Sequence, residues 1–238
     1  MNAFERRLRD RQDELDWLYM ELYNRRESLA ALKEMMADCY SQRGMGLRRL
    51  DSRREKDPLW YCRGNMLGMT MYTDLFAGDL AGLEKRLDYL TRQGITYLHL
   101  MPLLKMPHPD NDGGYAVEDF DQVDPALGTN EDLSRLTAAM RRRGMSLCLD
   151  FVINHTADTH QWAMRAKAGE QEYIDRYICY DTPEIPREME RTIPDVFPET
   201  APGSFLYQPE MGKYVCSSFH PYQWDLNYKN PVVFHEMT

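Results

Sequence analysis

A helix, a glycine and a buried strand follow one another twice in this chain, about 50 residues apart. In the first copy, leucines recur at helical spacing over 80–90, Gly94 stands where a helix would end, and an apolar run covers 95–101. Strands that alternate with helices form parallel sheets, and right-handed crossovers bring the carboxyl ends of those strands to one edge. The repeat therefore predicts an α/β fold.

The second copy supplies its own boundary signals. Thr129 and Asp132 have the spacing of a helix cap, Gly144 ends the helix, and the apolar run 145–153 reads as a strand. A further short apolar run at 66–72 precedes the first copy and predicts one more strand.

The rest of the chain does not show this alternation of helix and strand. Residues 1–60 show helical periodicity between charges, and Asp57-Pro58 marks a boundary. Aromatic residues at 17, 19 and 23 fit either a binding face or, more in keeping with their spacing, core positions. Residues 156–222 are rich in proline and predict an inserted subdomain, after which Pro231 opens another helix.

Charge and cysteine usage restrict the function. The formal net charge is −9 without a basic run, which argues against nucleic acid as a partner. The sequence shows neither a signal peptide nor an apolar span, so no membrane association is expected. Five widely spaced cysteines without a CxxC pair predict reduced thiols in a cytoplasmic protein, and no cofactor or metal is expected.

Polar side chains follow the predicted strand ends. Asp112 and Tyr115 come after the second strand, and Asn154 and His155 after the third. Carboxylates and imidazoles bind hydroxyl groups, and an aromatic face packs on a pyranose ring, so this set favours a sugar site. The same residues also fit a plain turn or a helix cap.

Several motifs resemble one known family. Residues 150–155 (DFVINH) resemble the first signature region of the α-amylase superfamily, glycoside hydrolase family 13, and 223–227 (QWDLN) resemble its signature near the end of the B domain. Within the superfamily the chain is most similar to amylosucrase and related sucrose hydrolases. The stretches that carry this likeness are 74–80 (DLFAGDL), 96–103 (TYLHLMPL), 112–117 (DGGYAV) and 124–129 (DPALGT), although Asp124 stands where that family often has asparagine.

The resemblance implies a domain order. It implies a helical N-terminal domain at 1–62, the first three strands of a (β/α)8 TIM barrel at 63–155, a B domain at 156–227 and the start of the next barrel helix at 228–238. The barrel is expected to be incomplete, because the chain stops before the fourth strand and begins partway through the family's helical domain. The family's nucleophilic aspartate and its glutamic acid, which follow the fourth and fifth strands, are therefore expected to be missing.

The resemblance also implies chemistry. It implies a retaining reaction on sucrose, in which glucose passes to an α-glucan or to water. Asp112, Tyr115 and His155 would line the glucose pocket, with Tyr115 as stacking platform and His155 bonded to a sugar hydroxyl. Phe219 and Gln223 would flank the adjoining subsite. Asn154 is expected to be structural rather than a calcium ligand.

Three readings stay open at this point: an amylosucrase-like fragment inactive alone, a non-catalytic sugar-binding or interaction module, and an amylase-like enzyme of other specificity. In all three cases, an incomplete barrel has free strand edges. If Leu98, Leu100, Leu147 and Leu149 face its interior, an apolar surface stays open. We therefore expect the isolated chain to aggregate or to form an oligomer that covers the open barrel edge.

Overall fold

A computed structural model describes residues 2–238 and divides the chain into two compact units. The first contains the residues up to Arg63 together with Tyr228–Thr238, and the second is Gly64–Asn227. The C-terminal segment that begins at Tyr228 thus belongs to the same unit as the N-terminal helices, and the predicted insertion belongs to the same unit as the parallel strands.

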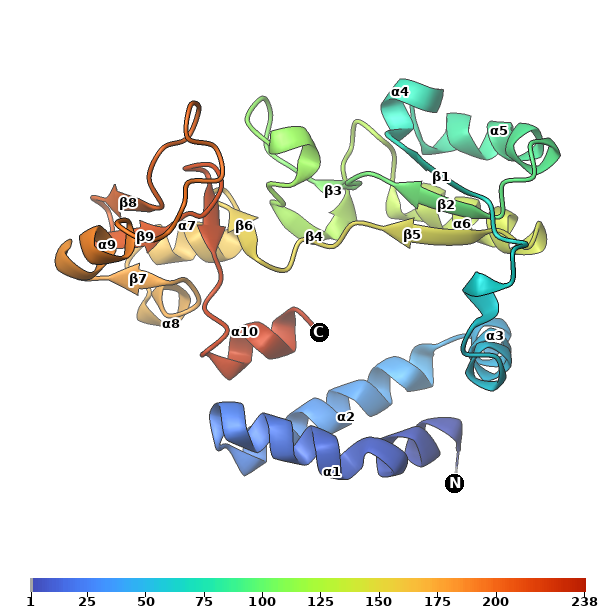
Figure 1. The fold of residues 1–238 in the computed structure, drawn as a ribbon, viewed down its shortest axis with the longest axis horizontal. Helices are drawn as coiled ribbons and strands as arrows, with labels where there is room; N and C mark the ends of the chain where they lie inside the picture. Colours follow the sequence, from blue (N-terminus) through green and yellow to red (C-terminus); the bar gives the residue numbers. More distant parts are fainter. Residues whose placement is uncertain (1) are drawn as a thin grey trace. The chain divides into compact units, whose positions relative to one another are not determined.

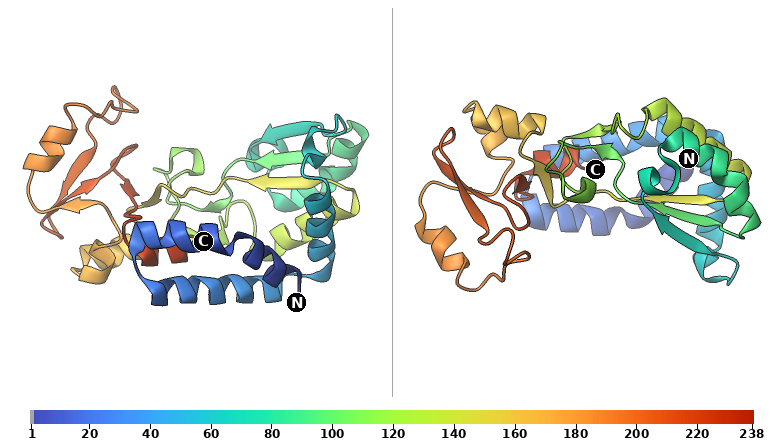
Figure 2. Two further views of the ribbon diagram at one scale, coloured as in Figure 1. Left: turned by 60° about the horizontal axis from the view of Figure 1, so that its bottom comes forward. Right: turned by 90° about the horizontal axis from the view of Figure 1, so that it is seen from above.

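The first unit is helical throughout (Figures 1 and 2). Tyr19, Leu29 and Leu32 form its buried centre, and Tyr19 Oη lies 2.8 Å from Nε2 of His235. Trp17, by contrast, is 62% exposed, so only part of the aromatic set is core. Its helices are α1 (Ala3–Tyr23), α2 (Arg26–Gln42), α3 (Met45–Lys56), the short 3-10 turn η1 (Trp60–Cys62) and α10 (Pro231–Glu236), which begins with Pro231 as predicted.

The second unit contains the predicted parallel sheet. Strands β1 (Gly68–Met71), β2 (Tyr97–Leu100) and β5 (Ser146–Leu149) pair in parallel in the order β1-β2-β5 (Figure 1). Helix α4 (Thr73–Ala77) follows β1, and helix α5 (Leu80–Arg92) leads into β2. The α/β fold is confirmed, and the three strands do not close into a barrel.

The crossover helices have the caps that the sequence predicts. Thr129 Oγ1 accepts a hydrogen bond from Asp132 N at 3.2 Å at the start of α6 (Asn130–Arg142), and Asp132 bonds back to the Thr129 backbone. Gly94 and Gly144 follow the last residues of α5 and α6 with φ of 78° and 72°, which a glycine adopts without strain. Local signals therefore set the ends of both helices.

The predicted facing of the strands is wrong. Leu98 and Leu100 are fully buried in the core that contains α5 and α6, and Leu147 packs against the same core. The opposite, uncovered face carries a row across the three strands that consists of Thr70, His99 and Cys148. Alternating side chains point to opposite faces of a strand, so Leu98, Leu100 and Leu147 face the helices and the polar row faces the side where a barrel interior would lie. Leu149, at the end of β5, is 37% exposed and lies outside this core. The expectation of an open leucine surface is thereby corrected.

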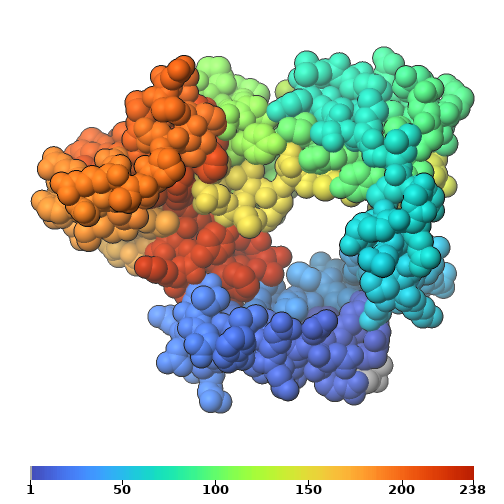
Figure 3. All heavy atoms as spheres, viewed as in Figure 1, coloured from blue at the N-terminus to red at the C-terminus, as the bar shows by residue number. Residues whose placement is uncertain are grey.

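The insertion is a small subdomain rather than a loop. Strands β7 (Cys179–Tyr180), β9 (Lys213–Cys216) and β8 (Phe205–Gln208) form an antiparallel sheet. Its atoms, orange in the space-filling view, make a compact body (Figure 3). The remaining elements of this unit are β3 (Leu104–Lys105), η2 (Asp112–Gly114), β4 (Asp119–Val123), β6 (His155–Ala157), α7 (Gln161–Lys167), α8 (Gln171–Ile174), α9 (Glu184–Met189) and β10 (Gln223–Asp225).

The third parallel strand is shorter than predicted. It ends at Leu149 rather than near 153, and Phe151 and Ile153 are 51% and 57% exposed. His155 consequently begins a new strand, β6, which pairs antiparallel with β10. This pairing joins the two signature regions, because Asp225 lies opposite His155 in the register.

A buried histidine makes this unit sensitive to pH. His160 caps α7, since its Nδ1 accepts the backbone N–H of Trp162 at 3.1 Å, and burial lowers its pKa to about 4. Only the unfolded chain then binds a proton between pH 6.5 and 4, so stability is full above pH 6.5 and falls as the pH drops toward 4. We expect a loss of about 3 kcal/mol over this range in urea titrations. His160→Asn, which keeps a capping oxygen, should lose correspondingly less; an identical pH profile in both proteins would contradict this prediction.

Two features are absent from residues 2–238. Within this range no helix combines the length and the apolar character needed to cross a membrane. The described residues also contain no group of three or more His, Cys, Asp or Glu side chains arranged to hold a metal ion. All five cysteines are free thiols.

Candidate functional site

The first part of the site lies where β2 and β5 end. Asp150 directly follows β5, and its two carboxylate oxygens have separate partners: Oδ1 lies 3.0 Å from Nε2 of His99, and Oδ2 accepts the Tyr115 hydroxyl at 3.2 Å. Burial raises the pKa of Tyr115, and the Asp150 charge raises it further, so the phenol stays a donor at neutral pH. Asp150 thus holds the predicted stacking ring in place.

The loop that carries Asp112 and Tyr115 depends on glycine. Gly114 has φ of 98°, and a Cβ there would lie 2.7 Å from Cβ of Pro102. The Asn111 side chain accepts the Gly114 N–H at 3.3 Å and stabilises the turn. Asp112 itself has φ of 51°, which is uncommon for a residue with a side chain. The DGGY motif is therefore a tight turn that presents a carboxylate and a phenol together.

His155 ties this loop to the second signature region. It is 3% exposed; its Nε2 donates to the Tyr115 carbonyl at 3.0 Å, and its Nδ1 faces the side-chain amide of Asn154 at 3.3 Å. Burial lowers its pKa, which favours the neutral ring with one donor and one acceptor nitrogen. Both nitrogens have protein partners, so a sugar hydroxyl would share the Nε2 donor with Tyr115. The hydrogen bond from His155 to sugar stays a prediction.

Residues from the end of the insertion complete the cluster. Gln223 is fully buried and donates from Nε2 to Asp112 Oδ2 at 3.3 Å. The Phe219 ring lies 5.1 Å from the His155 ring, centroid to centroid. The Tyr115 backbone N–H donates to the Asp112 carbonyl at 3.3 Å and joins the two halves of the set. All five predicted site residues are thereby connected: Gln223 with Asp112, Asp112 with Tyr115, Tyr115 with His155, and His155 with Phe219.

Asn154 has a structural partner. Its side-chain amide donates to Asp225 Oδ1 at 2.9 Å, and the other oxygen of this buried carboxylate accepts from Cys216 Sγ at 3.3 Å and from the Ser218 hydroxyl. Asp225 is 5% exposed, and these donors account for its burial. The amide of Asn154 therefore joins the two signature regions.

Two neighbours of the site, His99 and His220, are not among the predicted residues, while Asp150 is predicted only as part of the first signature motif, without a role of its own. His99 was hidden inside an apparently apolar run, although it alternates with the leucines, and alternation was the available signal. His220 Nε2 lies 3.6 Å from Asp112 Oδ1 and is close in space only because of the fold. In chemical terms the cluster offers acceptors, donors and aromatic faces for a hydroxylated ligand.

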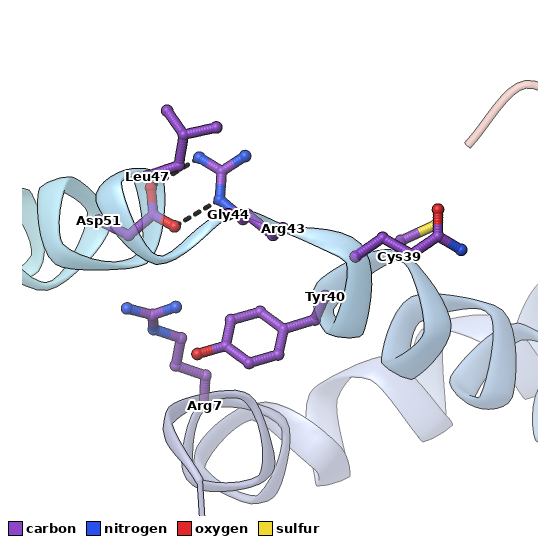
Figure 4. A pocket seen from close by; sticks show the side chains of 8 residues that line it. Arg7, Cys39, Tyr40, Arg43, Gly44, Leu47 and Asp51 are labelled. Carbon is purple, nitrogen blue, oxygen red and sulfur yellow. Dashed lines mark hydrogen bonds and ion pairs between the residues drawn. The ribbon is translucent and has the colours of Figure 1, made fainter.

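A separate hollow occurs in the helical unit. An open depression of about 550 Å³ is lined mainly by polar side chains (Figure 4). Arg43 Nε lies 2.6 Å from Asp51 Oδ2, and this hydrogen bond lowers the pKa of Asp51. The charges of this depression are paired, and none of the five predicted site residues lines it. The depression is therefore distinct from the cluster of predicted site residues. Its lining is Arg7, Cys39, Tyr40, Gln42, Arg43, Gly44, Leu47 and Asp51.

Comparison with known proteins identifies the family. Residues 37–238 match the catalytic domain of the alpha amylase family. Among curated proteins, the trehalose synthase of Pimelobacter sp. (strain R48) is 34% identical over 157 residues, which cover 66% of this chain and 26% of that protein. The chain therefore spans about a quarter of the length of this relative.

Solved structures show the same likeness. A mutant of the MutB protein in complex with the substrate sucrose superimposes with a TM-score of 0.64 at 30% identity, covering 76% of this chain and 32% of that one. An isomaltulose synthase variant from Erwinia rhapontici NX5, in complex with its natural substrate sucrose, gives a TM-score of 0.63 at 30% identity and covers 73% of this chain and 31% of that one. The fold, the signature regions and these matches agree, and the chain belongs to the α-amylase family.

Proposed function

We propose that this chain is the front part of a retaining α-glucosyl-transferring enzyme that acts on sucrose, in the manner of amylosucrase, and passes glucose to an α-glucan or to water. One observation carries the proposal: Asp112, Tyr115, His155, Phe219 and Gln223 form one connected cluster beyond the ends of the parallel strands. In barrels of this kind, the carboxyl ends of the strands carry the chemistry.

The family resemblance supplies the roles that we propose for the site residues. Asp112 accepts hydroxyl hydrogens of the glucose unit, and Tyr115 stacks on the ring. Phe219 and Gln223 flank the adjoining subsite, where the fructose unit sits. Two solved relatives that hold sucrose support this substrate. A cytoplasmic location, with the five thiols reduced, is part of the same proposal.

A second specificity has its own support, because a curated relative is a trehalose synthase. Titration of the isotope-labelled chain with sucrose, trehalose or maltose, followed by NMR, separates the two. We expect saturable shifts near Tyr115 and Gln223 with sucrose, and affinity lower on the order of tenfold in Tyr115→Ala because a stacking face is lost. Tyr207→Ala is the matched control, since Tyr207 is an exposed tyrosine of β8 outside the cluster.

The outcomes are distinct. Tighter binding of trehalose or maltose than of sucrose would replace the proposed specificity. Absence of binding to any of the three sugars, or equal loss in Tyr115→Ala and Tyr207→Ala, would overturn the assignment of the site.

A further inference from the structure

The imidazole of His220 is clamped between two aromatic rings. The Phe197 ring is 4.7 Å away at an interplanar angle of 20°, and the Tyr222 ring is 5.1 Å away at 3°. Phe197 belongs to a different part of the subdomain, the segment between α9 and β8. The imidazole cannot rotate out of its plane without losing both contacts, so the stack fixes the direction in which its ring nitrogens point.

The edge of this ring faces Asp112. His220 Nε2 lies 3.6 Å from Asp112 Oδ1, within ion-pair distance, and Gln223 Nε2 lies 3.3 Å from Oδ2. Burial raises the pKa of the Tyr222 phenol, and the negative charge of Asp112 raises it further. One four-residue segment, 220–223, therefore contacts both carboxylate oxygens of a residue more than 100 positions earlier in the sequence.

The segment is braced internally as well. Gln223 Oε1 accepts the His220 backbone N–H at 2.8 Å, and the Ser217 hydroxyl donates to the His220 carbonyl. The donors that face Asp112 are thus held from behind. Asp112 has a φ of 51°, a strained conformation that persists only where the surrounding contacts fix it. The braced segment supplies such contacts.

We propose that His220 is a positioning residue that orients the carboxylate of Asp112 for sugar binding. A carboxylate offers about four lone-pair directions. His220 and Gln223 each face one oxygen, which leaves the remaining directions for hydroxyl groups of the ligand. The inference rests on the proposed function, since it assigns His220 a task at that same site.

Two variants distinguish the effect of the Nε2 atom of His220 from the effect of its aromatic ring. His220→Phe keeps an aromatic ring in the stack and removes Nε2; His220→Gln restores a donor without the ring. The Gln223 side-chain amide signals in NMR report the position of Asp112, because Gln223 donates to it. His108→Phe is the matched control: His108 Nε2 also lies 3.3 Å from a carboxylate, that of Asp124, outside the cluster.

In His220→Phe we expect the Gln223 amide signals to move and sucrose affinity to fall by on the order of three- to tenfold, because one contact with the Asp112 carboxylate is lost. In His220→Gln the affinity should recover in part, and His108→Phe should match the parent chain in both measurements. Unchanged Gln223 signals and unchanged affinity in His220→Phe would overturn the proposal. If the parent chain binds no sugar but the Gln223 signals still move in His220→Phe, the proposed function fails, while the control of Asp112 by His220 stands.

Discussion

The 238-residue chain on its own is expected to release no fructose from sucrose. A retaining glycosidase needs two carboxyl groups roughly 5–5.5 Å apart across the bond that breaks, one as nucleophile and one as acid. The family's motifs for both follow later strands, and this chain ends its parallel sheet at β5. The two carboxylates of the site already have protein partners: Asp112 accepts a hydrogen bond from Gln223, and Asp150 contacts Tyr115 and His99. Binding without turnover is therefore the expected behaviour.

The measurement is fructose formation over hours at high protein concentration. Asp112→Ala is the informative comparison, since it removes the pocket carboxylate from the same chain. Equal background in both proteins fits the expectation and identifies that background as contamination. Fructose release by the parent chain that disappears in Asp112→Ala would contradict it, and would show that the present residues suffice for catalysis.

Gly114→Ala is expected to reduce the free energy of unfolding by about 2–5 kcal/mol. The new Cβ meets Pro102 Cβ at 2.7 Å, and the backbone has a positive φ of 98°. Collision in a packed site costs about 1–3 kcal/mol and left-handed backbone in a non-glycine residue about 1–2 kcal/mol. Sugar affinity should fall with stability, because Asp112 and Tyr115 belong to the same turn.

The matched control is Gly144→Ala. Gly144 also has a positive φ, 72°, but a Cβ there has no neighbour within 4 Å. It isolates the backbone strain, and we expect a loss of about 1–2 kcal/mol. Urea unfolding of both variants gives the comparison. Equal losses would show that Pro102 moves aside and that the close approach does not constrain the turn.

The sequence predicted the elements whose signals are local. Thr129 and Gly94 mark helix ends through bonds that span three or four residues, so their outcome depends little on the rest of the chain. The face of β2 was misjudged because a strand in a parallel sheet is covered on both sides and its leucines fit either. Tyr97 and His99, which alternate with Leu98 and Leu100, distinguish the polar face.

The site residues themselves needed the family resemblance. Gln223 and Asp112 are 111 positions apart, and neither spacing nor composition relates them. The early end of β5 could not be predicted from the hydrophobic pattern either, because Phe151 and Ile153 are apolar yet exposed. His220 could not be predicted for the same reason: the fold, and not the local sequence, brings it close to the Asp112 carboxylate.

The polar row of Thr70, His99 and Cys148 has a consequence for assembly. Strands that add to the edges of this sheet would gain backbone hydrogen bonds, and this polar row would lie beside the side chains that they bring. A shift by one residue would turn every side chain to the wrong face. Strands that complete the sheet would therefore be selected by their register.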